Sequence, residues 1–326
     1  MGGDHAPAAT TEGAIAAARE GIEVALVGDE PRLAAEIERL GGAPGGLSVV
    51  HAPDVIEMGE HAARAANRRK ESSTYIGIEL VRDGEADAFV SAGNTGAVFV
   101  VALLELGRLP GVERPAIGAP IPFPNGLTLL LDAGANAECR ASHLVQFAHL
   151  GSSYMHAARG VAEPRVGLLN IGEEGSKGSQ LTVETFERLS ESGLRFIGNV
   201  EGRDMVENRA DVVVTDGFTG NVVLKLGEGL MELLMGELRQ EAARSWRGRL
   251  GGLLIRPAAR RVRDSLDYRA HGAAPLLGID GCVFIAHGTS DAFAIANALR
   301  SAAADVERGT LAALRGAIEA AEGAGE

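Results

Sequence analysis

The sequence predicts an α/β protein built on a doubly wound, mostly parallel sheet, and three observations favour this class. First, short apolar runs rich in β-branched residues recur along the chain, and each ends in a loop that contains glycine. Second, several of these runs, such as residues 127–131, are apolar without alternation, which is typical of strands covered on both faces. Third, most runs are followed by a helical pattern, and this repeated order implies right-handed βαβ units. We therefore expect a single α/β domain over residues 1–326.

The strands are expected where these apolar runs occur. They lie at residues 24–28, 47–52, 87–93, 127–134, 166–172, 195–202, 211–217 and 282–288. Apolar residues make up 46% of the chain, which is enough to form a sizeable core. No linker rich in Pro, Gly or Ser divides the chain into separate domains.

Residues 220–270 interrupt this order and are predicted to form a helical hairpin that projects from the α/β body. Leucines at helical spacing predict a long amphipathic helix; they are Leu226, Leu230, Leu233, Leu234 and Leu238. The same spacing predicts a second helix from Ile255, Ala259, Val262 and Leu266. Pro257 is expected near the start of this second helix. Residues 244–255 are expected to connect the two helices.

The composition argues against several classes of protein. The formal net charge of −13 argues against bulk nucleic-acid binding. Cys139 and Cys282 are the only cysteines, so we expect neither a disulfide framework nor a cysteine-ligated zinc site, and a reducing cytoplasm fits best. No apolar run reaches 18 residues, so no segment is predicted to span a membrane. His143 and His149 do not share a helical face well, and we expect neither a metal nor a cofactor.

Five loops that follow predicted strands are the candidates for a ligand site. They are residues 91–96, 132–136, 170–178, 216–221 and 286–291. In a parallel sheet such loops lie at one edge, where α/β proteins bind their ligands. Each contains glycine, together with a Ser, Thr or Asn that can cap the next helix, whose free N–H groups attract phosphate. A cap is the ordinary structural role of one such loop, but five at one edge favour an anionic ligand.

Two residues of these loops are candidates for chemistry. Lys177 is one of only three lysines, with Lys70 and Lys225, whereas the other 28 basic residues are arginines. A lysine in a glycine-rich loop suggests a need for a compact ammonium charge, although a solvated loop lysine is the alternative. Asn221 follows Gly220 at an expected helix start, where its amide can donate to a carbonyl oxygen or simply cap the helix.

The hairpin carries a concentrated basic segment at residues 244–263. This segment holds seven arginines and no acidic residue, so it contributes +7 to the net charge while the rest of the chain contributes −20. Apolar residues lie beside the arginines; they are Trp246, Leu250, Leu253, Leu254 and Ile255. The combination favours contact with an anionic membrane surface or an acidic protein partner. An oligomer interface with a basic rim is the alternative.

Taken together, seven stretches of the chain resemble the phosphate acyltransferase (PlsX) family. They are residues 2–7, 91–96, 168–178, 199–202, 216–225, 274–278 and 286–290. The likeness covers essentially the whole chain in the same order. It implies a homodimer, with a fold similar to the phosphotransacetylases and to the isocitrate and isopropylmalate dehydrogenases.

The resemblance also implies an activity, which is the transfer of a long-chain fatty acyl group from acyl carrier protein to inorganic phosphate. The product, acyl phosphate, then serves a membrane glycerol-3-phosphate acyltransferase in phospholipid synthesis. We accordingly expect a cytoplasmic enzyme that associates peripherally with the membrane. The base of the hairpin would serve dimerisation and its tip would contact the membrane.

Lys177 and Asn221 match residues considered catalytic in this family. Phosphate is already a nucleophile near pH 7, so no acyl-enzyme is expected. Lys177 would neutralise and orient phosphate, and Asn221 would polarise the thioester carbonyl. The residues expected to bind phosphate or substrate are Asp4, His5, Asn94, Thr95, Gly96, Asn136, Ser176, Thr219, Gly220, His287 and Ser290.

The chain departs from the family at its start, because family members usually carry a short strand before Met-Gly-Gly-Asp. Met1 lies inside this motif, so we expect a start downstream of the natural one, with residues 2–4 unanchored. Two other functions are weighed against the acyl carrier protein reaction. A phosphotransacetylase-like enzyme with short acyl-CoA substrates would not need the apolar hairpin tip. A non-catalytic membrane scaffold that binds acyl carrier protein would leave the polar loops without a role.

Overall fold

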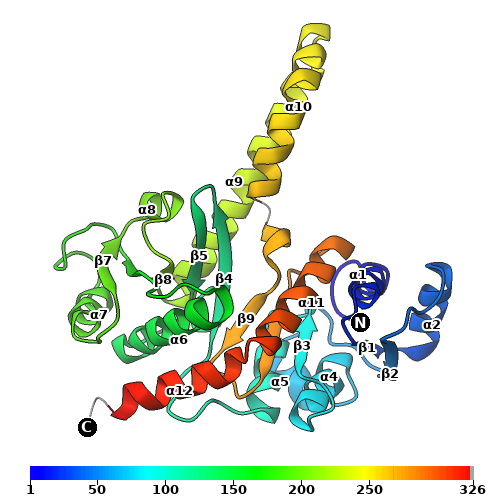
Figure 1. Cartoon of the computed structure of the whole chain (residues 1–326), viewed down its shortest axis with the longest axis horizontal. Coiled ribbons are helices and arrows are strands. Elements are labelled where there is room, and N and C mark those ends of the chain that lie inside the picture. Colours follow the sequence, from blue (N-terminus) through cyan, green and yellow to red (C-terminus); the bar gives the residue numbers. More distant parts are fainter. Residues whose placement is uncertain (267, 324–326) are drawn as a thin grey trace.

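The computed structural model describes residues 1–266 and 268–323 as an α/β fold with a projecting helical hairpin (Figure 1). The strands are β1 (Val24–Gly28), β2 (Leu47–His51), β3 (Ala88–Ser91), β4 (Ala116–Phe123), β5 (Gly126–Leu131), β6 (Val166–Leu169), β7 (Phe196–Val200), β8 (Val212–Val214), β9 (Ala274–Leu277) and β10 (Cys282–Ile285). The helices are α1 (Ala8–Arg19), α2 (Glu30–Arg39), α3 (Ala62–Arg68), α4 (Ser73–Arg82), α5 (Thr95–Glu105), α6 (Ala141–Arg159), α7 (Gln180–Ser190), α8 (Gly202–Val206), α9 (Gly217–Ala243), α10 (Trp246–Ser265), α11 (Ala292–Glu307) and α12 (Thr310–Gly323). A short 3-10 helix lies at Tyr268–His271.

The central sheet has eight strands in the order β3-β10-β9-β4-β5-β8-β6-β7. Four of its seven neighbouring pairs are parallel, so the predicted α/β class with a mostly parallel sheet is confirmed. β1 and β2 form a separate parallel pair. A groove of about 810 Å³ lies between the two sheets and is lined by residues of both β1 and β3.

Two strands of the central sheet, β4 and β9, have no counterpart among the predicted strands. Both contain proline, with Pro120 and Pro122 in β4 and Pro275 in β9. Proline cannot donate a hydrogen bond to a neighbouring strand, so it weakens the sequence signal for a strand. Pairing on both sides nevertheless holds each of them inside the sheet.

These two strands also reverse the direction of the sheet. β3 and β10 are parallel, but β9 is antiparallel to both β10 and β4, and β4 is antiparallel to β5. The block β5-β8-β6-β7 therefore runs opposite to β3 and β10, and its carboxyl ends lie at the opposite edge. The prediction that all five glycine loops share one edge is wrong. The loops after β3 and β10 lie at one edge, and those after β5, β6 and β8 at the other.

Both faces of the sheet are covered, as the uninterrupted apolar strands predict. In β5, Leu129 and Leu131 pack on one face with residues of α6 and α12. Leu130, between them, packs on the other face with residues of α5. All three leucines are fully buried, so alternate side chains of one strand belong to two cores.

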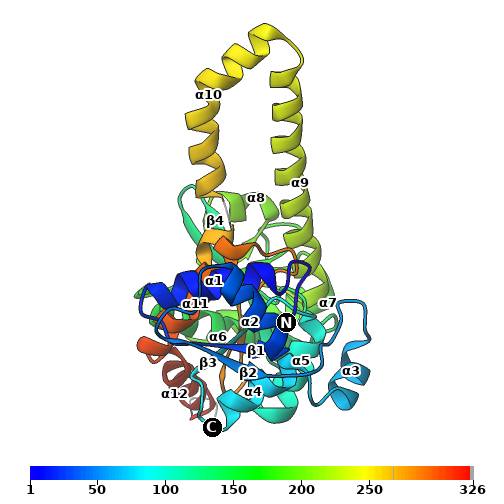
Figure 2. The same ribbon diagram turned by 90° about the vertical axis from the view of Figure 1, so that its right-hand side faces the viewer.

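α9 and α10 form the predicted hairpin, which extends away from the body as two long helices (Figure 2). The prediction that residues 244–255 connect these helices is wrong, because α10 begins at Trp246. Ser245 Oγ accepts a hydrogen bond from the Gly248 N–H (2.9 Å) and so caps the second helix at once. Pro257 consequently lies in the middle of α10 rather than near its start.

Residues 2–4 are anchored, contrary to the expectation of a loose loop. The Asp4 N–H donates to the carbonyl oxygen of Gly288 at 2.8 Å. Gly3 has a φ of +102°, and a Cβ atom there would lie 3.2 Å from the carbonyl oxygens of both Ala92 and Gly288. Only glycine fits this conformation without strain, so backbone contacts hold the loop against the ends of β3 and β10.

Candidate active site

The loops after β3 and β10 form the first half of the candidate site. They meet residues 1–4 so closely that a Cβ atom at Gly2 would lie 2.6 Å from the Cα atom of Gly93. Ser91 Oγ accepts a hydrogen bond from the Gly93 N–H (3.1 Å), which shapes the turn that leads into α5. Because α5 and α11 both begin at these loops, their first N–H groups and positive helix ends favour an anion here.

Asn94, predicted to bind substrate, has both ends of its amide engaged with protein atoms. Its Oδ1 caps α5 by accepting from the Ala97 N–H (3.0 Å). Its Nδ2 lies 3.0–3.3 Å from the carbonyl oxygens of Glu57, Met58 and Glu60. The side chain therefore holds residues 57–60 against the start of α5.

Thr95 and Gly96, which are also predicted to bind phosphate or substrate, differ in their surroundings. Thr95 is exposed at the first position of α5. A Cβ atom at Gly96 would lie 2.8 Å from the Cβ atom of Ala62, so glycine lets α3 pack directly on α5. Thr95 thus faces solvent at the helix start, whereas Gly96 serves helix packing.

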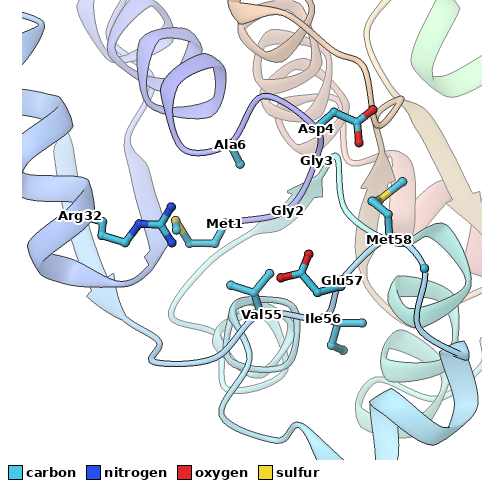
Figure 3. A pocket seen from close by; sticks show the side chains of 11 residues that line it. Met1, Gly2, Gly3, Asp4, Ala6, Arg32, Val55, Ile56, Glu57 and Met58 are labelled. Carbon is cyan, nitrogen blue, oxygen red and sulfur yellow. The ribbon is translucent and has the colours of Figure 1, made fainter.

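A pocket of about 380 Å³ opens beside residues 1–6 (Figure 3). Arg32 enters it from α2, Glu57 and Met58 from the segment before α3, and Asp4 from the loop that contacts Gly288. Two carboxylates against one guanidinium make its lining unfavourable for phosphate. Asp4 and His5 are both exposed, and this pocket does not support Asp4 as a phosphate ligand.

His287 lies in the loop after β10 and makes two short side-chain contacts. Its Nε2 lies 2.7 Å from the Nζ atom of Lys225, which belongs to α9. Its Nδ1 lies 2.8 Å from the Oγ1 atom of Thr289. Ser290 is buried next to Asp291, whose carboxylate caps α11 through the Ala294 N–H (2.9 Å). The loop thus leads into the capped start of α11 and contacts α9 through His287.

Asp132 organises the second half of the site, at the end of β5. Its buried carboxylate accepts hydrogen bonds of 2.6–3.1 Å from the backbone N–H groups of Ile117, Gly134, Ala135 and Asn136. Burial raises the pKa of Asp132, and these hydrogen bonds oppose that effect. Asn136 Nδ2 donates to the same carboxylate and to the carbonyl oxygen of Pro115 (2.7 Å). Asn136 is therefore a buried structural residue of this loop.

The start of α9 packs directly against the loop after β5. Two glycines of α9 make this possible, because any side chain at their positions would push the helix and the loop apart. A Cβ atom at Gly217 would lie 2.7 Å from the carbonyl oxygen of Asn136. One at Gly220 would lie 1.9 Å from the carbonyl oxygen of Asp132. Thr219 donates from both its N–H and its hydroxyl to the N-cap residue Asp216 (2.8 Å each). Gly220 and Thr219 thus fix the position from which the next residue projects.

That next residue is Asn221, the fifth residue of α9, which is exposed. Its Cβ, Cγ and Oδ1 atoms lie 3.7 Å from the position that a Cβ atom at Gly134 would take. Asp216 already caps the helix, so the alternative in which Asn221 acts as the cap does not apply. Its amide is at the surface of the loop after β5.

Lys177 lies in the loop after β6, which other contacts hold in place. Asn170 Nδ2 donates to the carbonyl oxygen of Lys177 (3.0 Å), and Asn199 Nδ2 donates to that of Glu174 (2.9 Å). Ser176 and Lys177 are exposed on this loop. β6 and β8 are adjacent parallel strands, so the loop that carries Lys177 and the start of α9 that carries Asn221 lie side by side at the same edge of the sheet.

Cys139 lies close to the second half of the site but is unsuited to act as a nucleophile. Its Sγ atom lies 3.6 Å from the carbonyl oxygen of Asn136. Burial, followed by the charge of Asp132, raises the pKa of the Cys139 thiol to about 12. Burial likewise raises the pKa of Cys282 to about 11. Both thiols are therefore protonated at neutral pH.

The hairpin residues predicted to contact a membrane are all exposed. Trp246 is 71% exposed and Leu254 77%, and Leu250, Leu253 and Ile255 lie between 53% and 62%. No helix in the described ranges is long and apolar enough to cross a membrane. Residues 1–266 and 268–323, which the structure describes, contain no group of three or more His, Cys, Asp or Glu side chains that could hold a metal ion.

The structure also assigns parts to residues that sequence reasoning passed over. Asp132 received no role, although it ends an apolar strand at a glycine loop. Lys225 received none either, although it is one of three lysines and follows Asn221 by one helical turn. The contact between Lys225 and His287 has no sequence signal, because the two residues are 62 positions apart.

Comparisons with known proteins give consistent results. The family described as "Fatty acid synthesis protein" matches residues 1–313. The chain is 47% identical over 323 residues to a phosphate acyltransferase of Pelotomaculum thermopropionicum, covering 99% of this chain and 94% of the relative. It is 51% identical over 321 residues to that of Thermus thermophilus, covering 98% and 97%. It is 52% identical over 322 residues to that of Myxococcus xanthus, covering 96% and 90%.

Solved structures with a similar fold are much more distant in sequence. The EutD phosphotransacetylase from Staphylococcus aureus superposes with a TM-score of 0.60 at 18% identity, covering 91% of this chain and 90% of its own. A 4-hydroxythreonine-4-phosphate dehydrogenase from Klebsiella pneumoniae gives 0.54 at 12% identity, covering 91% and 94%. These likenesses confirm the predicted phosphotransacetylase-like and dehydrogenase-like fold. Over nearly its whole length, the chain belongs to the phosphate acyltransferase family and is an acyltransferase.

Proposed function

We propose that this enzyme transfers a long-chain fatty acyl group from acyl carrier protein to inorganic phosphate, and that the acyl phosphate serves phospholipid (phosphatidic acid) synthesis. The observation that carries the proposal is the 47–52% identity, over 96–99% of the chain, to relatives named phosphate acyltransferase. The site supports it with Lys177 in the loop after β6 and Asn221 near the start of α9, which follow adjacent parallel strands.

The reaction proceeds by direct attack. A phosphate oxygen attacks the carbonyl carbon of the thioester, an oxyanion forms, and the carbon–sulfur bond then breaks. The carrier leaves as a thiolate that takes up a proton, and the acyl group remains on phosphate. The raised pKa values of Cys139 and Cys282 support this route, because neither protonated thiol is a good nucleophile for an acyl-enzyme.

In this mechanism Lys177 acts on the phosphate and Asn221 acts on the carbonyl oxygen that becomes the oxyanion. The ammonium group of Lys177 neutralises and orients the phosphate that attacks. The amide of Asn221 donates a hydrogen bond to the carbonyl oxygen and stabilises the oxyanion. The starts of α5 and α11 supply N–H groups for phosphate, with Thr95 and His287 beside them.

We propose two roles for the hairpin, which are dimerisation and membrane contact. The exposed leucines of α9 form a dimer interface at its base; they are Leu226, Leu230, Leu233, Leu234 and Leu238. The apolar side chains at the start of α10, with the arginines beside them, contact an anionic membrane. The enzyme is then cytoplasmic but peripherally bound to the membrane, near the glycerol-3-phosphate acyltransferase that consumes acyl phosphate.

The activity is tested by incubating the protein with phosphate and either long-chain acyl carrier protein or acetyl-CoA, and measuring acyl phosphate. We expect product from the acyl carrier protein. Product from acetyl-CoA alone would favour the phosphotransacetylase-like alternative, and no product from either donor would favour a non-catalytic scaffold.

The roles of the two catalytic residues are tested by Lys177→Ala and Asn221→Ala. Removing one donor to a transition-state charge costs about 10²–10³ in turnover number, so we expect losses of that size. Lys70→Ala, which removes an exposed lysine two residues after the end of α3, is the matched control and should retain full activity. Undiminished acyl-phosphate synthesis by either site variant would contradict that residue's role.

The membrane role is tested with the double variant Trp246→Glu/Leu254→Glu in sedimentation with phosphatidylglycerol vesicles. Burying one large apolar side chain contributes about 1.5–3 kcal/mol, so losing two should weaken vesicle binding by at least about a hundredfold. Leu104→Glu, at an exposed leucine of α5 in the body, is the control. Unchanged vesicle binding accompanied by a change of oligomeric state in light scattering would assign the tip to an oligomer interface instead.

A further inference from the structure

Two large apolar side chains are exposed next to the residues proposed to be catalytic. Ile171, in the loop after β6, is 81% exposed, and Phe218, the second residue of α9, is 67% exposed. The isoleucine is even more exposed than Leu254 at the tip of the hairpin, which is 77% exposed. Single exposed apolar residues are common on protein surfaces, so the argument depends on where these two lie relative to Lys177 and Asn221.

The loop after β6 holds Ile171 close to Lys177. One side chain, that of Asn170, connects them: its Oδ1 accepts from the Ile171 N–H (2.8 Å) and its Nδ2 donates to the carbonyl oxygen of Lys177 (3.0 Å). The stem of Lys177 lies against the residue that follows Ile171, because a Cβ atom at Gly172 would lie 3.3 Å from Cγ of Lys177. The exposed isoleucine is therefore a neighbour of the proposed phosphate-binding lysine.

The start of α9 likewise places Phe218 beside Asn221. Gly217 and Gly220 face the loop after β5, since Cβ atoms at these positions would lie 2.7 Å and 1.9 Å from its carbonyl oxygens. Phe218 lies between the two glycines in sequence but is exposed, so it belongs to another side of the helix. Phe218 and Asn221 are three residues apart, and residues at this spacing are neighbours on a helix surface. An aromatic ring thus lies next to the amide that is proposed to bind the carbonyl oxygen.

The strand register brings the two apolar residues to the same edge of the sheet. Leu168 of β6 is paired with Val214 of β8. Ile171 follows Leu168 by three residues and Phe218 follows Val214 by four, so both lie a short distance beyond strands that are about 4.8 Å apart. The two apolar residues therefore belong to the same small part of the surface as the two residues proposed to be catalytic.

The surroundings of Asn221 favour one direction for an apolar ligand. On one side its Oδ1 lies 3.7 Å from the position that a Cβ atom at Gly134 would take, so the loop after β5 fills that space. Farther along the same face of α9, Lys225 and Glu228 form an ion pair (2.9 Å), and covering these charges with a hydrocarbon chain is unfavourable. Phe218 is the apolar neighbour. An acyl chain is bonded to its carbonyl carbon, so a chain whose carbonyl lies at Asn221 must begin here.

We propose that Ile171 and Phe218 bind the part of the acyl chain that lies next to the reacting carbonyl. The inference deepens the proposed function and rests on it for the position of that carbonyl at Asn221. Neither side chain carries a polar group, so their contribution is the burial of apolar surface when the chain covers them. Lys177 and Asn221 act on the reacting atoms, whereas Ile171 and Phe218 determine which donors bind well.

The proposal is tested first by equilibrium binding, which requires no turnover. The palmitoyl form and the unacylated form of acyl carrier protein are each titrated into the protein in a calorimeter, without phosphate. We expect the wild type to bind the palmitoyl form at least about tenfold more tightly. The double variant Ile171→Ala/Phe218→Ala should lose most of this difference. Equal binding of the two forms by the wild type, or a double variant that retains the whole difference, would overturn the proposal.

Kinetics on the single variants separates binding of the acyl chain from binding of phosphate. Burying a large apolar side chain is worth about a tenfold to hundredfold effect, so kcat/KM for the palmitoyl donor should fall about tenfold or more in Ile171→Ala and in Phe218→Ala. The KM for phosphate should change by less than about threefold. Leu104→Ala, at an exposed leucine near the end of α5, is the matched control and should leave both quantities unchanged. A rise in the KM for phosphate as large as the loss in kcat/KM would overturn the proposal.

A second copy of the chain is the rival occupant of the surface at Phe218, because the leucines proposed as a dimer interface follow on the same helix, beginning with Leu226. Light scattering on Phe218→Ala distinguishes the two. We expect the same oligomeric state as in the wild type. A loss of the oligomer, together with equal weakening of the palmitoyl and unacylated carriers, would assign Phe218 to the subunit interface and overturn its role in acyl binding.

The proposed function and this inference fail in different ways. If the wild type forms no acyl phosphate from any donor, the proposed function fails. The calorimetric comparison of palmitoyl and unacylated carrier then still decides the inference. A preference for the palmitoyl form that disappears in Ile171→Ala/Phe218→Ala and persists in Leu104→Ala supports the acyl-binding role, and any preference that all three proteins share rejects it.

Discussion

The contact between Gly220 and the loop after β5 gives a sharp prediction about both stability and activity. A Cβ atom at Gly220 would lie 1.9 Å from the carbonyl oxygen of Asp132 and 3.1 Å from Cγ2 of Thr215. Ordinary contact begins at 3.4 Å, so Gly220→Ala forces α9 and this loop apart by about 1.5 Å. The obstacle is backbone, which five hydrogen bonds to the Asp132 carboxylate hold in place, and so it cannot move aside cheaply.

Two effects follow from this displacement. Overpacking of this kind costs typically about 1–3 kcal/mol in the free energy of unfolding. Asn221 is the next residue, and a misplacement of about 1 Å in a catalytic group can cost about a hundredfold in rate. Gly220→Ala should therefore lower the urea midpoint and reduce acyl-phosphate synthesis by about a hundredfold in the protein that remains folded.

The same substitution at Gly316 is the matched control. Gly316 is exposed in α12 and a Cβ atom there would meet nothing within 4 Å. Alanine at an open helix position stabilises by about 0.5–1 kcal/mol, so the two variants should shift stability in opposite directions. A Gly220→Ala variant with a free energy of unfolding within about 0.5 kcal/mol of the wild type and an undiminished turnover number would contradict this prediction.

Two further predictions concern charge and the thiols. Burial opposes ionisation of Asp211, but three hydrogen bonds of 2.8–3.0 Å from Arg165 hold its pKa below the ordinary value. A carboxyl with a lowered pKa stabilises the fold above its ordinary pKa of about 3.9 and loses that contribution as the pH falls through its folded value. Asp211→Asn should therefore lower the free energy of unfolding by about 1.5–3 kcal/mol at pH 7, with a smaller difference at pH 3; a difference independent of pH would contradict this account. Because the pKa values of Cys139 and Cys282 are raised to about 12 and about 11, both thiols should react with iodoacetamide at pH 8 at least about a hundredfold more slowly in the native protein than in urea. Native thiols that react as fast as the unfolded ones would show that this burial is not maintained in solution.

Local patterns predicted most of the strands, because each of these strands is marked by its own apolar run. β5 illustrates the rule: residues 127–131 are leucines apart from Thr128, and the structure fully buries residues 128–131 on both faces of the strand. The two strands without such a signal, β4 and β9, contain prolines and depend on neighbours on both sides for their place in the sheet. A pattern within one segment cannot report on partners that lie far away in the chain.

In the candidate site, too, some features follow from local sequence patterns and others depend on contacts between distant segments. The glycine loops and their polar residues can be identified from sequence, because each follows a strand and precedes a helix. The sequence does not show that Asn94 and Asn136 are committed to protein contacts, whereas Thr219 supports the cap of α9 and Asn221 remains exposed. These roles depend on which carbonyl or carboxylate lies within 3 Å, and that is a property of packing.

By itself the sequence determined the α/β class, the projecting basic hairpin, the family and the residues that carry polar groups. The tertiary structure decided how those residues are grouped. Two antiparallel strands reverse the sheet, so the loop with Lys177 and the start of α9 with Asn221 lie at one edge and the loop with His287 lies at the other. α9 connects the two groups through Lys225, because a long helix can carry side chains from one edge of a sheet to a loop of the other. Strand direction is set by hydrogen bonds between distant segments, and for that reason only the folded chain reveals it.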